Sequence, residues 1–251
     1  MWPEGRPSTG AKPSTKEILK IARRTTSIIK SKITSNVCLF GSAAVYLCAD
    51  PSRIPDVRID VLARILLVLP LTAHPQDVDM VINTPFYDDE QIKKIIVEAD
   101  SRYFLQRSNK WPNAKYMKLY CRLPGWHRNG RCVKVDILVP PSDLGLPEIL
   151  ASDTPVIKDI PVMPLFALLV MKTQGWWDHR VSFREDFRAK VPADIDDVDA
   201  LLDRAADEDV DYDQECGQYT SKFMNKALRM ARKFVRHNGR REKWEAIGFP
   251  L

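Results

Sequence analysis

Val37-Cys38-Leu39-Phe40-Gly41-Ser42 opens the stretch that decides the fold, and Asp77-Val78-Asp79-Met80-Val81-Ile82 closes it. The first run is short and apolar, and the Ala43–Leu47 segment that follows its Gly-Ser pair is typical of a helix. The second run alternates as a β-strand does, so Asp77 and Asp79 are expected to project from the same face of a sheet. We therefore predict a strand, a glycine turn, a helix and a second strand that carries two acids.

The two acids and the glycine turn together indicate a binding site. Two carboxylates side by side on an apolar strand repel each other and are costly to remove from water. A bound divalent cation usually offsets this repulsion. Oxygen ligands of this kind suit Mg²⁺, which also binds substrate phosphates. Gly41 and Ser42, at a helix N-terminus, offer backbone N–H groups and a hydroxyl to a phosphate. The stretch therefore predicts a site for a metal–nucleoside triphosphate complex.

A third acid occupies a comparable place in a later strand. Asp136 lies in the run Lys134–Pro140, between Val135 and Ile137, and shares a face with Lys134. We predict that Asp136 joins the first two acids in one metal site. The alternative is three structural acids, each satisfied by local partners.

The second half of the chain offers weaker candidates. Lys172 lies in a predicted helix, Leu165–Gln174, and is either a triphosphate contact or a lysine that extends from the helix edge to water. Arg180 follows a tryptophan pair and either reaches a phosphate or forms a surface ion pair. The acids of Asp194–Asp199 precede a leucine pair with helical spacing, so the helix dipole explains them without a metal. The last predicted helix, Tyr219–Val235, is basic and either binds RNA or is simply a solvated face.

Composition excludes several classes of protein. The chain has 251 residues, 45% of them hydrophobic and 28% charged, which is typical of a soluble globular protein. Its five cysteines form no C-x-x-C pair, which favours free thiols in a reducing compartment, so we expect a cytoplasmic protein with the nucleus as the alternative. The most apolar window, Ile65–Ala73, is far shorter than the roughly 20 residues that span a bilayer, so a membrane protein is not expected.

The order of the predicted elements gives a domain organisation. Residues 1–13 are predicted to be a disordered tail, residues 14–140 the catalytic core, and residues 141–251 a helical C-terminal subdomain. A helix is expected to begin after Ser14, because Ser14 and Glu17 match a capping box.

Residues 57–76 lengthen the spacing between Ser42 and Asp77 beyond what a compact unit needs. Valine codons begin with GT and a glutamine codon can end in AG, so Val57 and Gln76 could mark the ends of a retained intron. Removing the segment would join Asp56 in frame to Asp77. The alternative is a genuine helical insertion. If the segment is translated, it could displace the acid pair and inactivate the product.

These motifs resemble the DNA polymerase β-type nucleotidyltransferase superfamily, in a minimal, antitoxin-system-like form similar to uncharacterised fungal proteins. The resemblance covers roughly residues 33–202. It depends on short motifs that match as a set: Gly41-Ser42, Arg53-Ile54-Pro55, Asp77-Val78-Asp79, Lys134–Leu138, Lys172 and Asp194-x-x-Asp197.

The resemblance implies an α/β (α+β) fold, in which helices flank a small mixed β-sheet and a helical C-terminal part follows. It implies that Asp77 and Asp79 hold two Mg²⁺ ions, with Mn²⁺ as the alternative, and that Asp136 completes the site and helps to activate an acceptor hydroxyl. Gly41 and Ser42 would hold the triphosphate, ATP or another nucleotide. The acceptor is left open among RNA, protein and a small molecule. The rival interpretation is an inactive relative that binds nucleotide or RNA.

Overall fold

The computed structural model describes residues 11–49, 75–108, 116–126, 130–140 and 145–251. Most of the predicted tail and of the predicted insertion, together with Arg53-Ile54-Pro55, lie outside the described residues. The chain divides into two compact units. We call the first the sheet unit (Met1–Ala43, Pro75–Ser142 and Glu148–Val162) and the second the helical unit (Ala44–His74, Asp143–Pro147 and Met163–Leu251).

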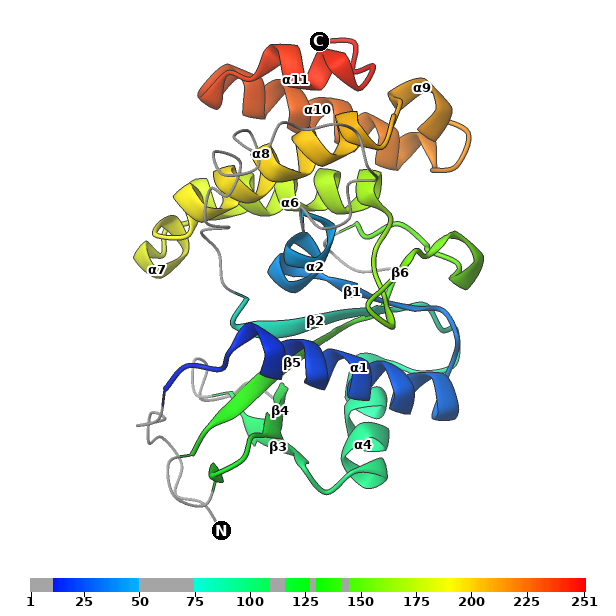
Figure 1. Cartoon of the computed structure of the whole chain (residues 1–251), viewed down its shortest axis with the longest axis vertical. Helices are drawn as coiled ribbons and strands as arrows, with labels where there is room; N and C mark the ends of the chain where they lie inside the picture. Colours follow the sequence, from blue (N-terminus) through cyan, green and yellow to red (C-terminus); the bar gives the residue numbers. More distant parts are fainter. Residues whose placement is uncertain (1–10, 50–74, 109–115, 127–129, 141–144) are drawn as a thin grey trace, which may run out of the picture. The chain divides into compact units, whose positions relative to one another are not determined.

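A five-stranded mixed sheet forms the centre of the sheet unit (Figure 1). Its strands, in spatial order, are β1 (Val37–Phe40), β2 (Asp77–Ile82), β5 (Cys132–Leu138), β4 (Met117–Arg122) and β3 (Tyr103–Arg107). The β2–β5 pair is parallel, whereas the other three pairs are antiparallel. A small hairpin of β6 (Val156–Ile157) and β7 (Ile160–Pro161) follows, next to a short helical turn, η2 (Ala151–Asp153). The predicted mixed sheet is confirmed.

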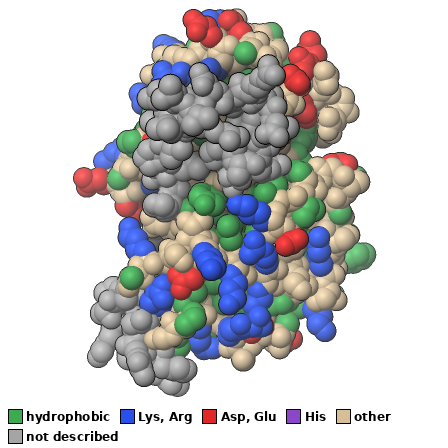
Figure 2. Space-filling view, viewed as in Figure 1, with side chains coloured by type: hydrophobic (Ala, Val, Ile, Leu, Met, Phe, Trp, Pro, Cys, Tyr) green, Lys and Arg blue, Asp and Glu red, His purple; other side chains and the backbone are tan. Residues whose placement is uncertain are grey.

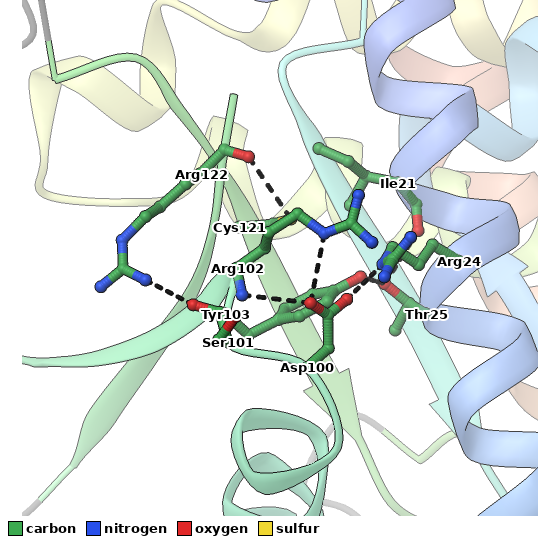
Figure 3. Close-up of polar contacts among 9 residues, drawn as sticks. All are labelled: Ile21, Arg24, Thr25, Asp100, Ser101, Arg102, Tyr103, Cys121 and Arg122. Atoms are coloured by element: carbon green, nitrogen blue, oxygen red, sulfur yellow. Dashed lines mark hydrogen bonds and ion pairs between the residues drawn. The ribbon is translucent and has the colours of Figure 1, made fainter. Parts of the chain in front are cut away.

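Two helices, α1 (Thr15–Lys32) and α4 (Asp89–Ala99), pack on the sheet. Both begin with a capping box, one at Ser14 as predicted and one at Asp88. The hydroxyls of Thr25 on α1 and Tyr103 on β3 lie 2.8 Å apart in a hydrogen bond (Figure 3). Tyr103, Cys121 and Val133 are register partners, so this buried row faces α1.

The opposite face of the sheet carries the polar residues. Side chains alternate along β5, where Val133, Val135 and Ile137 are buried and the residues between them are partly exposed. Lys134 and Asp136 therefore point away from the face that packs on α1. The acids of β2 lie on the same side, because Asp77 pairs with Lys134 and Asp79 pairs with Asp136.

The helical unit has a core of three long helices, α6 (Leu165–Arg180), α8 (Val191–Asp207) and α10 (Ser221–Asn238). Short helices connect or follow them: α7 (Glu185–Arg188), α9 (Tyr212–Glu215) and α11 (Arg241–Ala246). The helix that we expected to end at Gln174 continues through Gly175 to Arg180. Trp176 is fully buried and its ring centroid lies 4.9 Å from that of Phe234, so packing outweighs the roughly 1 kcal/mol cost of a helical glycine.

All five cysteines are free, and Cys38, Cys48 and Cys121 are buried, in line with the predicted free thiols. None of the helices within the described ranges combines the length and the apolar character that crossing a bilayer requires.

Candidate active site

The three predicted acids meet on the polar face of the sheet. Asp77, Asp79 and Asp136 each place one carboxylate oxygen so that the three oxygens lie within 4.8 Å of one another. The parallel pairing of β2 and β5 brings this about, since it sets Asp79 directly beside Asp136 and leaves Asp77 two residues away on the same face. All three side chains are partly exposed. We call this group the acid cluster.

The donor set of the acid cluster fits a hard divalent cation. Three carboxylates at this separation repel one another, and carboxylate oxygens are the ligands that Mg²⁺ and Ca²⁺ prefer. One cation of the chain already lies in the cluster, because Lys134 forms an ion pair with Asp136. Burial lowers the pKa of Lys134, but the charges of Asp136 and Asp77 outweigh this effect and the pKa lies above its ordinary value. A single lysine leaves the cluster with net negative charge.

Gly41 brings the glycine turn against the acid cluster. It follows β1 directly and begins α2 (Gly41–Cys48), with a φ of +67° that favours glycine. A Cβ at this position would overlap the carboxylate of Asp79. Phe40 is the register partner of Asp79, which explains the close approach. Ser42 follows and is partly exposed; its predicted contact with a phosphate stays a prediction.

Two tyrosines of β4 and its approach lie near the acids, and sequence reasoning missed them. Burial raises the pKa of Tyr116, and the negative charge of Asp136 raises it further. Tyr120 is the register partner of Lys134. The ammonium of Lys93 lies 4.3 Å from the ring centroid of Tyr116. The strand period alone could have placed Tyr120, since it separates Tyr120 from the buried Leu119 and Cys121.

Lys172 lies in a buried ionic group of the helical unit. Its Nζ is 2.6 Å from Oδ2 of Asp197 and 3.6 Å from Oδ1 of Asp194, and all three side chains are at most 10% exposed. Nδ1 of His179 lies 2.6 Å from Oδ2 of Asp194. The helix dipole is thus only part of the reason for these two acids, because a buried lysine needs them as well. The predicted triphosphate contact of Lys172 stays a prediction.

Arg180 ends α6 and is exposed. Its Nη2 lies 3.3 Å from Nδ1 of His237, and its guanidinium lies 6.0 Å from the ring centroid of Trp176. These neighbours belong to the helical unit itself. A role of Arg180 in phosphate binding stays a prediction.

Comparison with solved structures identifies the fold. The chain is similar to an antigenic nucleotidyltransferase-like protein from Paracoccidioides brasiliensis, with a TM-score of 0.54 over 95% of this chain and 96% of that chain. This chain has a nucleotidyltransferase-type fold. The identity is 17%, so the likeness is one of fold alone.

Two Helicobacter pylori structures are similar over most of their length, with lower TM-scores. One is JHP933 (12% identity, 94% of this chain and 97% of that chain, TM-score 0.38). The other is a presumed nucleotidyltransferase (12% identity, 88% of this chain and 95% of that chain, TM-score 0.36). No protein-family model matches the sequence, and no curated protein matches it either.

Proposed function

We propose that this chain is a nucleotidyltransferase that moves a nucleoside monophosphate from a nucleoside triphosphate to a hydroxyl acceptor. The acid cluster carries the proposal, because it places three carboxylates within 4.8 Å of one another beside the turn at Gly41. A mixed sheet with acids on two paired strands also suits the fold that the comparison identified. The fold by itself does not specify an activity.

In this proposal Asp77, Asp79 and Asp136 are the metal ligands, for two Mg²⁺ ions with Mn²⁺ as the alternative. When bound, the cations would neutralise charge on the reacting phosphate and on the departing pyrophosphate. The carboxylates provide only oxygen ligands, which suits these hard cations better than a soft metal.

The chain's own groups would carry the remaining steps. Backbone N–H groups of Gly41 and Ser42, with the Ser42 hydroxyl, would bind the triphosphate. Asp136 would accept the proton of the acceptor hydroxyl while the acceptor oxygen bonds to the α-phosphorus. The bond between the α-phosphorus and the bridging oxygen would break, and pyrophosphate would leave. Lys134, which donates to the Asp136 carboxylate, would orient that carboxylate.

Label transfer tests the proposal. The protein is incubated with each α-labelled nucleoside triphosphate and cell extract, with and without Mg²⁺, and labelled product is separated by size and by nuclease or protease treatment. Transfer is expected to require Mg²⁺ and to fall at least about a thousandfold in Asp77→Asn and Asp79→Asn, which keep the side-chain shape but remove the charge. Asp196→Asn is the matched control, since this exposed acid belongs to the helical unit, and it is expected to keep full activity.

The same experiment distinguishes the transferase from the rival interpretation, an inactive relative that binds nucleotide or RNA. A protein that binds nucleotide equally well before and after Asp77→Asn, and transfers no label from any triphosphate, would be a binding module, and the proposed transferase would be wrong. Lys172→Met and Arg180→Ala, assayed for KM with the triphosphate, test the two predicted phosphate contacts of the helical unit.

A further inference from the structure

A row of register partners crosses the polar face of the sheet and connects the acid cluster to three aromatic rings. Asp77 on β2 pairs with Lys134 on β5, Lys134 pairs with Tyr120 on β4, and Tyr120 pairs with Phe104 on β3. Partners in register share a face, so the row runs from the acids toward the β3 edge. Neighbouring strands lie about 4.8 Å apart, which puts Tyr120 about 10 Å and Phe104 about 14 Å from the acid strand.

The rings at the far end of the row form one partly exposed group. The ring centroids of Phe104 and Tyr120 lie 5.6 Å apart with an interplanar angle of 21°, so the two rings are nearly parallel. Trp126 lies beside them, with its centroid 4.9 Å from that of Phe104. Each of the three side chains is partly exposed. We call Phe104, Tyr120 and Trp126 the aromatic platform.

A guanidinium accompanies the rings. The Cζ of Arg122 lies 4.8 Å from the centroid of Phe104 and 5.7 Å from that of Trp126. One of its nitrogens donates to the backbone carbonyl of Ser101, which fixes the group at the edge of the platform (Figure 3). Cation and rings therefore present one mixed surface, on the same face of the sheet as the acid cluster.

We propose that the aromatic platform binds the bases of a single-stranded nucleic acid whose terminal hydroxyl is the acceptor at the acid cluster. Bases stack on aromatic side chains in such sites, while arginine or lysine side chains contact the phosphates. The role of the terminal hydroxyl as acceptor rests on the proposed transferase function. The binding of the bases to the aromatic platform needs neither metal nor triphosphate. It selects nucleic acid from the acceptor classes that the sequence left open.

A basic surface lies on the other side of the sheet from the aromatic platform, so affinity for nucleic acid does not by itself test the proposal. Figure 2 shows Lys and Arg side chains gathered over α1, which packs on the opposite face of the sheet. Exposed Lys16, Lys20 and Lys30 belong to this helix. Such a surface attracts any polyanion, double-stranded or single-stranded, whereas stacking needs unpaired bases. The decisive observations are therefore strandedness and dependence on the rings.

Fluorescence anisotropy of a short labelled single-stranded RNA, in EDTA and without nucleotide, provides the measurement, with the same RNA annealed to its complement as comparison. The wild type is expected to bind the single strand several-fold more tightly than the duplex. Phe104→Ala and Tyr120→Ala are each expected to weaken single-strand binding about tenfold and to leave duplex binding unchanged. Phe86→Ala is the matched control, because this phenylalanine of the sheet unit is 79% exposed and lies outside the platform.

Two further variants separate stacking from folding. Phe104→Leu keeps apolar volume without an aromatic face and is expected to lose affinity as the alanine variant does, whereas Phe104→Tyr keeps the ring and is expected to retain affinity. The inference is overturned if the leucine variant binds the single strand as the wild type does, or if duplex and single strand bind equally.

An acceptor that is a protein or a small molecule would give label transfer with no affinity for the single strand, which overturns this inference and leaves the transferase intact. Undiminished single-strand binding by Asp77→Asn, with no label transfer by the wild type, would overturn the transferase and the acceptor role of the terminal hydroxyl, and would leave the binding of bases to the aromatic platform standing.

Discussion

Gly41 is required because the Asp79 carboxylate occupies the space that a Cβ would fill, and because its φ is +67°. Gly41→Ala is expected to lower the free energy of unfolding by about 1–3 kcal/mol, since it adds both backbone strain and overlap. If the acid cluster binds Mg²⁺ as proposed, Mg²⁺ is expected to raise the melting temperature of the wild type, and Gly41→Ala is expected to weaken that rise because Asp79 must move. Calorimetry with and without Mg²⁺ measures both effects.

Gly175→Ala is the control for that substitution. Gly175 lies inside α6, and a Cβ there would meet no atom within 4 Å. Alanine is therefore expected to stabilise the protein by up to about 1 kcal/mol and to leave the Mg²⁺ response unchanged. Equal effects of the two substitutions would contradict the contact between Gly41 and Asp79.

Lys226 on α10 gives the protein a pH dependence of known sign. Burial, with the nearby charges of Arg229 and Lys222, lowers its pKa from 10.5 to about 8. Between these two pH values the unfolded chain binds more protons than the folded one, so this lysine makes stability rise with pH across that window. Its Nζ also donates to the carbonyl of Gly145, at 2.5 Å.

Lys226→Met is therefore expected to remove that rise, while Lys222→Met, at an exposed position of the same helix, should keep most of it, because burial of Lys226 is the largest cause of its lowered pKa. Urea unfolding midpoints measured across the window give the comparison. The buried thiols of Cys38 and Cys121 have raised pKa values, which lowers stability at alkaline pH. This effect is the same in the wild type and both variants, so each variant is compared with the wild type by the difference in its unfolding midpoint at each pH. Parallel curves for the wild type and Lys226→Met would show that the pKa of Lys226 is not depressed.

At the scale of elements, α6 and α8 are joined by the ionic group of Lys172, Asp194 and Asp197. Lys172→Met leaves two buried acids without their lysine and is expected to cost about 3 kcal/mol, and Asp197→Asn should destabilise by a similar amount. The double variant should lose less than the sum, because the two residues share one interaction. Denaturant unfolding of the wild type, the two single variants and the double variant gives the four free energies of this double-mutant cycle.

The same variants separate packing from phosphate binding. Asp197→Asn keeps the lysine, so it should leave the KM for the triphosphate unchanged, whereas Lys172→Met should raise that KM if the lysine contacts phosphate as predicted. A loss of stability with no change in KM for either variant would assign Lys172 a structural role only.

Local signals predicted the elements well where chain neighbours decide the outcome. The capping box at Ser14 and the alternation of β5 are both properties of a few adjacent residues, and both are confirmed. The end of α6 was missed because a glycine suggests a stop locally, while the burial of Trp176 against α10 is a tertiary effect. The ion pair of Lys172 with Asp197 was missed for the same reason.

At the scale of the whole molecule, the acid cluster depends on a pairing that no spacing rule provides. Period-two alternation predicts that Asp77 and Asp79 share a face, but only the parallel register of β2 and β5 sets Asp79 beside Asp136, which is distant in the chain. The sequence alone could identify the three acids as candidates, because carboxylates in apolar strands are costly to remove from water and need a compensating partner. It could not supply the row that leads from them to Tyr120 and Phe104, since that row needs the order of four strands.

The segment 57–76 gives the last prediction. It ends directly before β2, and the three acids lie within 4.8 Å of one another in the chain that contains the segment. Pairing with β1 on one side and β5 on the other fixes β2, and neither partner belongs to the segment. A variant that lacks residues 57–76 is therefore expected to keep any stabilisation by Mg²⁺ and any label transfer within a few-fold of wild type.

The matched control for that deletion replaces the segment with a Gly/Ser linker of equal length, which keeps the spacing and discards the sequence. If both variants retain the response to Mg²⁺, the segment is dispensable for the site, as a retained intron or a peripheral insertion would be. Loss of the response in both variants, with the melting of the helical unit unchanged, would mean that residues of the segment itself support β2. The dispensable-segment prediction would then be wrong, and transcript reads that contain the corresponding nucleotides throughout would exclude the intron as well.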